Sequence, residues 1–133
     1  MSNSDTVREM YAAFGRGDVP AILEKMADDV EWEYVKYPTN VPWLQQVRGK
    51  EGVMRFFEAL QLMDFHRFEP TEILEGNNVV VALIQLETTV KATGRKIVET
   101  DEGHIWRFNN EGKVQSFAHR VDSHQHWLAY NDK

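Results

Sequence analysis

Two strand-like segments near the C-terminus, Glu102–Phe108 and Lys113–Val121, constrain the fold more than any other part of this sequence. The four residues between them read Asn-Asn-Glu-Gly. Asn and Gly tolerate the positive φ that a tight reversal of the chain requires. The sequence therefore predicts a β-hairpin over these residues.

The inward faces of this hairpin combine large apolar side chains with histidines. Because side chains alternate between the two faces of a strand, His104 shares a face with Glu102 and Trp106, and His119 shares one with Phe117. A face that served only as core would be more uniformly apolar, since a buried imidazole without a partner costs about 1–3 kcal/mol. We predict that the two faces line one pocket, into which His104 and His119 point.

Length and composition are those of one globular domain, residues 1–133, with 42% hydrophobic and 27% charged residues. A net charge of −6 argues against nucleic acid or an anionic membrane as a partner. The absence of cysteine excludes a disulfide framework, a thiolate nucleophile and Cys-ligated zinc. No apolar run of membrane-spanning length or signal-peptide pattern is present, so we expect a cytoplasmic location.

Three helices are expected in the N-terminal half. Residues 5–16 carry apolar side chains on one stripe, at Val7, Met10, Tyr11 and Phe14. A second, short helix is expected from the N-cap Asp18 as far as Asp28 and Asp29. A third begins at Gly49, and its apolar face consists of Val53, Phe56, Phe57 and Leu60.

Strands make up most of the remaining chain. Val30–Tyr34 alternates as a half-buried strand, and strands alternate with turns from Phe65 onward, with Val79–Val90 the longest. This order predicts an α+β fold with a cone-shaped, curved antiparallel sheet and three N-terminal-half helices packed on its concave face. Ile84, Leu86 and Val90 indicate an outer sheet face that is not wholly polar, so we expect a homodimer.

The expected pocket suits a small hydrophobic molecule. Tyr34 would donate a hydrogen bond into it, beside the two histidines. The residues expected to contact the ligand are Tyr11, Trp32, Trp43, Phe57, Glu102, Trp106 and Phe117. No cofactor is expected, and no metal, because the spacing of the C-terminal histidines follows no zinc signature. We expect His124 and His126 to be solvated in a C-terminal tail, and Asp122 to cap the C-terminal turn or to pair with an arginine.

Several short phrases, taken in order, resemble the SnoaL-like proteins of the ketosteroid isomerase and nuclear transport factor 2 superfamily. Each phrase is weakly specific, whereas the ordered set covers nearly the whole chain. The phrases are Met10-Tyr11-Ala12-Ala13-Phe14 with Gly17-Asp18, Ala27-Asp28-Asp29-Val30-Glu31-Trp32, Arg48-Gly49-Lys50-Glu51-Gly52-Val53 with Phe56-Phe57, Val79-Val80-Val81, Lys91-Ala92-Thr93-Gly94, His104-Ile105-Trp106, and Gly112-Lys113-Val114.

The resemblance implies site residues at particular positions. The general-base aspartate of ketosteroid isomerase corresponds to Tyr34, its protonated aspartate to His104, and its oxyanion tyrosine to Met10, beside Tyr11. Neither aspartate is present, which argues against steroid isomerisation by that route. In polyketide cyclases, a histidine and an acid/base aspartate correspond to His104 and His119.

Two functions from different classes follow. The first is acid–base isomerisation or aldol-type cyclisation of a hydrophobic cyclic or polyketide-like carbonyl compound, with His119 as the base and His104 and Tyr34 steadying the oxyanion. The second is a non-catalytic module of the same fold that binds a hydrophobic ligand or dimerises. Epoxide hydrolysis ranks last, because Arg107 and Arg120 have no convincing acidic partners on their faces.

Overall fold

A computed structural model describes residues 1–33 and 38–132 of the chain. Its helical elements are α1 (Asn3–Gly15), α2 (Val19–Leu23), the short 3-10 turn η1 (Pro42–Leu44), α3 (Gly49–Leu60) and α4 (Ser123–Asn131). Its strands are β1 (Met26–Trp32), β2 (Val47–Arg48), β3 (Met63–Glu75), β4 (Val79–Val90), β5 (Lys96–Phe108) and β6 (Val114–Arg120). The α+β class is confirmed.

The strands form one curved, open sheet in the order β2-β1-β6-β5-β4-β3. The four long C-terminal strands are a meander of antiparallel neighbours, as predicted, and the reversal before Lys113 is a hairpin turn. One pair differs from the antiparallel expectation, because β1 runs parallel to β6, with Trp32 opposite Phe117. The parallel pairing places the inward face of β1 beside that of the hairpin.

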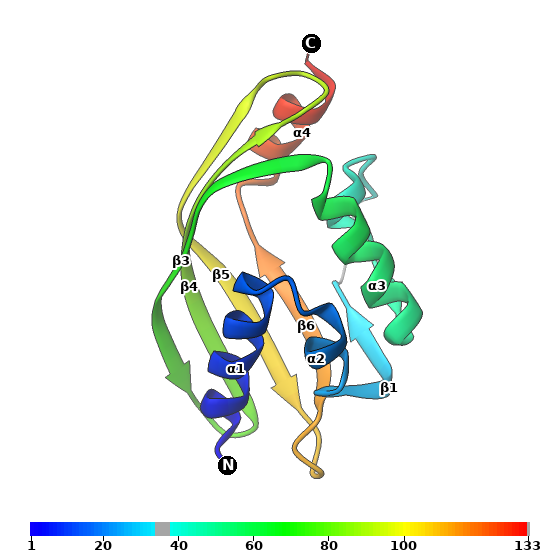
Figure 1. Ribbon diagram of the computed structural model, residues 1–133, viewed down its shortest axis with the longest axis vertical. Coiled ribbons are helices and arrows are strands. Elements are labelled where there is room, and N and C mark those ends of the chain that lie inside the picture. The colour runs from blue at the N-terminus through cyan, green and yellow to red at the C-terminus, as the bar shows by residue number, and fades with distance from the viewer. Residues whose placement is uncertain (34–37, 133) are drawn as a thin grey trace.

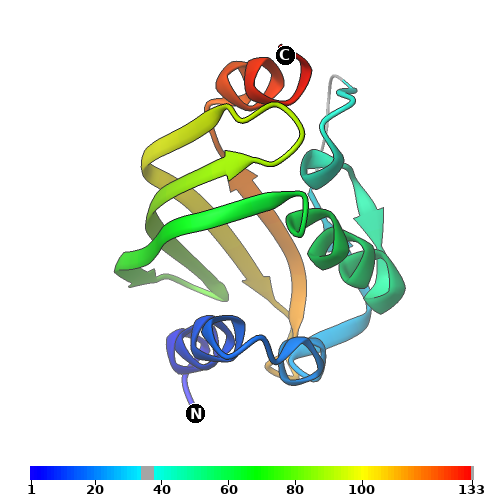
Figure 2. The ribbon, with the colours of Figure 1, turned by 45° about the horizontal axis from the view of Figure 1, so that its top comes forward.

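The sheet encloses a hollow that the helices cover. Figures 1 and 2 show β3, β4 and β5 curling away from the flat part of the sheet, with α1 and α2 across one end and α3 beside β1. On β4 every second residue is buried, and this inward face is apolar from Val80 to Val90 except at Thr88. Register shifts in the β3–β4 and β4–β5 pairs mark bulges, which bend a sheet locally.

Several boundaries differ from the sequence-based expectation, and two of them change which residues are buried. The second helix does not reach Asp28 and Asp29 but ends at Leu23, because Met26 is already a buried residue of β1. The C-terminal segment is not a solvated tail: it forms α4, whose N-cap Asp122 accepts a hydrogen bond from the backbone of Gln125 at 3.1 Å. The capping role expected of Asp122 is confirmed. No helix in the described part of the chain is long and apolar enough to cross a membrane.

The residues from which a homodimer was expected lie on the opposite face. Ile84, Leu86 and Val90 are all buried in the concave face of one chain rather than on the outer surface. That part of the prediction is wrong, since the parity of β4 directs these side chains toward the helices. The homodimer itself stays a prediction.

Candidate functional site

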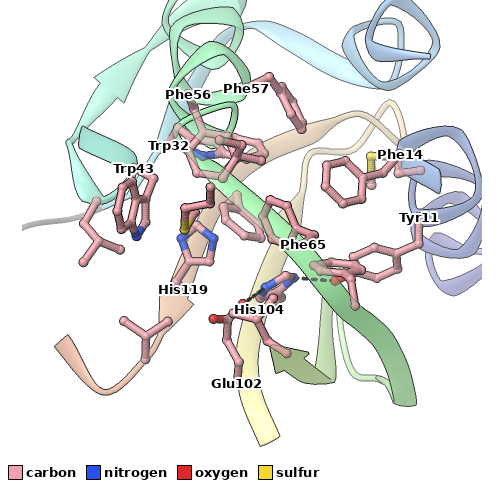
Figure 3. Close-up of a pocket in the computed structure, with 18 of the residues that line it drawn as sticks. Tyr11, Phe14, Trp32, Trp43, Phe56, Phe57, Phe65, Glu102, His104 and His119 are labelled. Carbon is pink, nitrogen blue, oxygen red and sulfur yellow. Dashed lines mark hydrogen bonds and ion pairs between the residues drawn. The ribbon is translucent and has the colours of Figure 1, made fainter. Parts of the chain in front are cut away.

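A cavity of about 70 Å³ lies between the concave face of the sheet and the helices. This is several times the roughly 10–15 Å³ that one water molecule requires. Its wall is mostly aromatic, and Figure 3 shows rings from α1, α3, β1 and β3 directed toward the polar groups of β5 and β6. The cavity therefore has two sides of different polarity. The apolar rings form one side, which we call the wall, and the polar side chains of β5 and β6 form the other, which we call the floor.

Hydrogen bonds on one side of this floor form a continuous chain through His104. Trp106 Nε1 donates to the Tyr11 hydroxyl oxygen at 3.0 Å, and that oxygen lies 2.7 Å from His104 Nδ1. On the other side of the ring, His104 Nε2 lies 2.7 Å from Glu102 Oε2. Alternation along β5 puts Glu102, His104 and Trp106 on one face, as predicted, and Tyr11 meets them from α1.

This chain fixes the protonation of His104. A carboxylate only accepts, so Nε2 carries the proton that is donated to Glu102, and Nδ1 accepts the proton of Tyr11. Burial lowers the pKa of His104 below its ordinary value of 6.5, although Glu102 opposes that shift. Burial likewise raises the pKa of Tyr11, so its hydroxyl stays protonated. His104 is a neutral ring whose two nitrogens are both engaged.

A second pair, His119 and Glu33, lies beside this chain. His119 is directly opposite His104 across the β5–β6 pair, and the two ring centres are 5.1 Å apart. His119 Nδ1 lies 3.1 Å from Glu33 Oε1, within ion-pair range but not aligned for a hydrogen bond, while the same oxygen accepts the backbone N–H of His119. No hydrogen bond joins the other ring nitrogen, Nε2, to another residue among those described.

Glu33 reaches this position because of an unusual backbone conformation. Its φ is +63°, in the left-handed region that non-glycine residues seldom occupy, and its N–H donates to the carbonyl of Phe117 at 2.7 Å. Regular alternation after Trp32 would direct Glu33 to the outer face. The positive φ instead buries the carboxylate, leaving the residue 8% exposed.

The surroundings shift the two histidines in opposite directions. Burial alone lowers the pKa of His119, but the charge of Glu33, aided by Glu102 and Glu99, outweighs it and raises that pKa above 6.5. For Glu102, burial raises the pKa, but the hydrogen bond from His104 and the charge of His119 outweigh burial, so that the pKa lies below its ordinary value of 4.5. One imidazole is thus held neutral, and its neighbour is poised to bind a proton.

A third histidine, His126, closes the far end of the floor. The indole of Trp43 donates to His126 Nδ1 at 2.9 Å, and His126 Nε2 lies 3.2 Å from Glu99 Oε2. His126 is 2% exposed, so the expectation that it is solvated is wrong, whereas His124, two residues earlier and therefore on the other side of α4, is exposed. The network joins α4 to η1 and β5.

A bulge in β5 places Glu99 on the same face as Glu102. Regular alternation would put residues three apart on opposite faces. The β4–β5 register shifts between these residues, and Asp101 within the shift has a φ of +62°. Both carboxylates therefore point inward, toward the three histidines.

Two groups in the described residues have donor atoms close enough to hold a metal ion. Their ligand atoms lie within 4.8 Å of one another, and the groups are Glu102, His104 and His119, and Glu99, Glu102 and His126. Imidazole and carboxylate donors suit several divalent cations. Both nitrogens of His104 and of His126 are engaged, so a metal ion would have to replace hydrogen bonds already present.

All the residues predicted to contact a ligand line the cavity where the structure describes them. These are Tyr11, Trp32, Trp43, Phe57, Glu102, Trp106 and Phe117. His104 and His119 line it as well, whereas Tyr34 lies outside the described residues. Sequence reasoning missed Glu33, Glu99 and His126. Of these, only His126 carries a signal, because its spacing to Ala129 and Tyr130 is helical after the N-cap Asp122.

Comparisons with known proteins agree with this architecture. The family profile described as a SnoaL-like domain matches residues 7–117. An NTF2-like protein of unknown function from Burkholderia pseudomallei has 28% identity and a TM-score of 0.84, with 98% of this chain and 99% of that chain covered.

Two further solved structures share the fold at lower identity. A proposed SnoaL-like polyketide cyclase from Mesorhizobium loti has 20% identity and a TM-score of 0.70, covering 90% of this chain and 99% of its own. A proposed polyketide cyclase from Pseudomonas putida has 19% identity and a TM-score of 0.74, covering 97% and 98%. No curated protein matches this chain.

Proposed function

Because this chain belongs to the SnoaL-like family, we propose that its cavity binds a small hydrophobic carbonyl compound and catalyses acid–base isomerisation or cyclisation of it. The observation that carries this proposal is the His119–Glu33 pair, which presents a buried imidazole of raised pKa to an apolar cavity. Two structural neighbours bear the name polyketide cyclase, which is consistent with a polyketide-like substrate.

In this proposal His119 is the general base. Its Nε2 removes a proton from the carbon next to the carbonyl, and the electron pair of that C–H bond forms an enolate. Glu33, on the Nδ1 side of the ring, stabilises the imidazolium that results. In isomerisation, the proton returns from Nε2 to a different carbon of the substrate. In cyclisation, the enolate carbon attacks a second carbonyl, whose oxygen takes up the proton.

His104 has a different task in this scheme. Its two nitrogens are bonded to Tyr11 and Glu102, so it offers no spare N–H to an oxyanion. We assign it a positioning role: it keeps Glu102 paired and places a neutral ring, nearly perpendicular to that of His119, with the two ring centres 5.1 Å apart. A neutral ring in this place also spares His119 the repulsion that a second imidazolium would exert.

Exchange of α-protons tests the base without knowledge of the natural substrate. 2-Indanone is a small hydrophobic ketone, and NMR in D₂O follows the replacement of its α-hydrogens by deuterium. The wild-type protein should accelerate this exchange, and His119→Gln should lower the accelerated rate about 100-fold or more, as expected for loss of a general base. The affinity for 2-indanone should change by no more than about threefold, since no direct bond to the ketone oxygen is assigned to His119.

His124→Gln is the matched control, because His124 is exposed on α4 and away from the cavity. It should behave as the wild type in both measurements. If the wild-type protein binds 2-indanone but does not accelerate exchange, the catalytic proposal is wrong. The alternative then holds: a ligand-binding module of the same fold, favoured by the predominantly aromatic wall of the cavity.

A further inference from the structure

The indole N–H of Trp32 is a buried donor without a partner. Trp32 is 1% exposed, and its Nε1 has no hydrogen-bond acceptor among the described residues. The other two tryptophans of the cavity differ, since Trp43 donates to His126 and Trp106 donates to Tyr11. Buried donors are nearly always paired, so an unpaired one that lines a cavity indicates the place of an absent acceptor.

Packing fixes the direction of this N–H. The Trp32 ring stacks on Phe117 with centres 4.2 Å apart and an angle of 27°, and it meets the edge of Trp106 at 5.8 Å and Phe56 at 5.2 Å. Contacts on several sides hold the ring in this orientation, in which the described residues offer its N–H no acceptor. In Figure 3 the indole lies above His119, with its nitrogen on the side of Trp43.

Trp32, the unpaired donor, and His119, the proposed base, contact the same two phenylalanines. Phe117 stacks on Trp32 and packs edge-on against His119 with ring centres 4.7 Å apart, while Phe56 contacts the same two residues, at 5.2 Å and 5.4 Å. Trp32 and His119 therefore face one part of the cavity from β1 and β6. A ligand that contacts one of them through a polar group presents neighbouring atoms to the other.

We propose that Trp32 Nε1 donates a hydrogen bond to the carbonyl oxygen of the ligand and thereby selects cyclic ketones over hydrocarbons of the same shape. An indole N–H can only donate, so the group that it selects is an acceptor such as a carbonyl oxygen, and not an ammonium group. The selection of ketones concerns binding alone. The further role, in which the same N–H steadies the enolate oxygen, rests on the function proposed for His119.

A matched pair of ligands and one conservative variant test the selection. 2-Indanone and indane differ in the carbonyl group, and Trp32→Phe keeps an aromatic ring against Phe117 while removing the N–H. The wild-type protein should bind 2-indanone more tightly than indane. Trp32→Phe should reduce the ratio of the two affinities about fivefold, as expected for one hydrogen bond, because any loss of packing affects both ligands alike. Trp127→Phe is the control, since Trp127 is 45% exposed, and it should leave the ratio unchanged.

The indole N–H resonances give a second test, made on the wild-type protein, that does not depend on the folding of Trp32→Phe. Each resonance is assigned from the variant that lacks it or, for Trp32, by elimination among the four tryptophans. Saturation with 2-indanone should move the Trp32 proton downfield, as a new hydrogen bond does, and indane should not. The proposal is overturned if that proton responds equally to both ligands or to neither, or if the wild type shows no preference for the ketone.

Failure of this inference and failure of the proposed function give different results. If the wild-type protein prefers 2-indanone through Trp32 but does not exchange its α-hydrogens, the assignment of Trp32 as donor stands and that of His119 as base is wrong. If the wild type and Trp32→Phe exchange these hydrogens equally well and the ratio of affinities is unchanged, the assignment of Trp32 as donor is wrong. The assignment of His119 as base then stands.

Discussion

Glu33 is the residue on which the chemistry of the cavity depends most. A non-glycine residue at positive φ costs of order 1–3 kcal/mol, and such conformations cluster at functional sites. Here the conformation brings a carboxylate to the ring of His119 and to its backbone N–H. The side chain that raises the pKa of the proposed base is thus held in place by a strained backbone.

Replacing Glu33 with Gln should change the pH dependence of α-proton exchange. His119 acts as a base only when it is neutral, so the wild-type rate rises with pH through its raised pKa. Without the carboxylate, burial continues to lower the pKa while the largest opposing charge is gone. The rising limb of the rate profile for 2-indanone should therefore move to lower pH, and the NMR titration of His119 should move with it.

The same variant has a defined effect on stability. Because the folded-state pKa of His119 exceeds 6.5, its ion pair stabilises the fold fully below that pH and is lost as pH rises through the folded pKa. The free energy of unfolding of Glu33→Gln should therefore fall furthest below that of the wild type in mildly acidic solution. Glu31→Gln, on the exposed side of β1, is the control, and an equal effect of the two variants would contradict the assignment.

The sequence predicts His104, His119 and the carboxylate partner of His104, but not Glu33, the carboxylate partner of His119. Regular alternation along β5 and β6 suffices to place His104 and His119 on one face, and that parity is confirmed because both line the cavity. For Glu33, alternation gives the wrong face, since no sequence pattern announces a glutamate at positive φ. The chemical roles of the two histidines stay predictions.

At the scale of elements, α4 is held against the sheet by a buried polar network. His126 joins Trp43 of η1 to Glu99 of β5, and Glu99 also accepts the backbone N–H of Asp122 at 2.9 Å. Replacing His126 with Leu would leave the Trp43 N–H unpaired and remove one partner of Glu99. We expect a loss of about 2–4 kcal/mol in the free energy of unfolding, since each unsatisfied buried group costs about 1–3 kcal/mol.

Urea unfolding measures this loss, and hydrogen exchange locates it. The backbone amides of α4 should exchange faster in His126→Leu, while those of β4 should change only with the global stability. His124→Leu is the matched control on the same helix, and its exposed position should make the change nearly neutral. A His126→Leu protein as stable as the control would show that the network contributes nothing to the docking of α4.

Element boundaries and bulges limit what the sequence predicts about this network. The Asp122 N-cap and the helical spacing of His126, Ala129 and Tyr130 are visible in the sequence, so α4 is within reach of pattern analysis. The bulge at Asp101 is not, because a strand pattern with one extra residue still reads as a strand. Without that bulge, Glu99 would be assigned to the outer face.

At the scale of the molecule, polarity changes along the cavity. Four half-buried phenylalanines from α1, α3 and β3 pack together on one side, with Phe14 in contact with each of the others. The opposite side holds the buried carboxylates and imidazoles. A ligand with an apolar ring system and one polar end would match both sides. This distribution follows from the parity of the strands and could be predicted, whereas the cavity volume depends on packing and could not.

The homodimer remains a prediction, now from different residues. Val81, Leu83 and Ile105 are half-buried on the outer face of β4 and β5, where Val81 is opposite Ile105 in the register. An apolar sheet face of this kind is stabilised by burial against a second copy.

Light scattering coupled to size exclusion should give twice the 15.5 kDa of one chain. Ile105→Lys should give a single chain with an unchanged circular dichroism spectrum, because a charge at the centre of the interface is costly to desolvate. Asn110→Lys adds the same charge in the exposed hairpin turn and should leave the dimer intact. A wild-type mass of one chain at micromolar concentration would contradict the prediction.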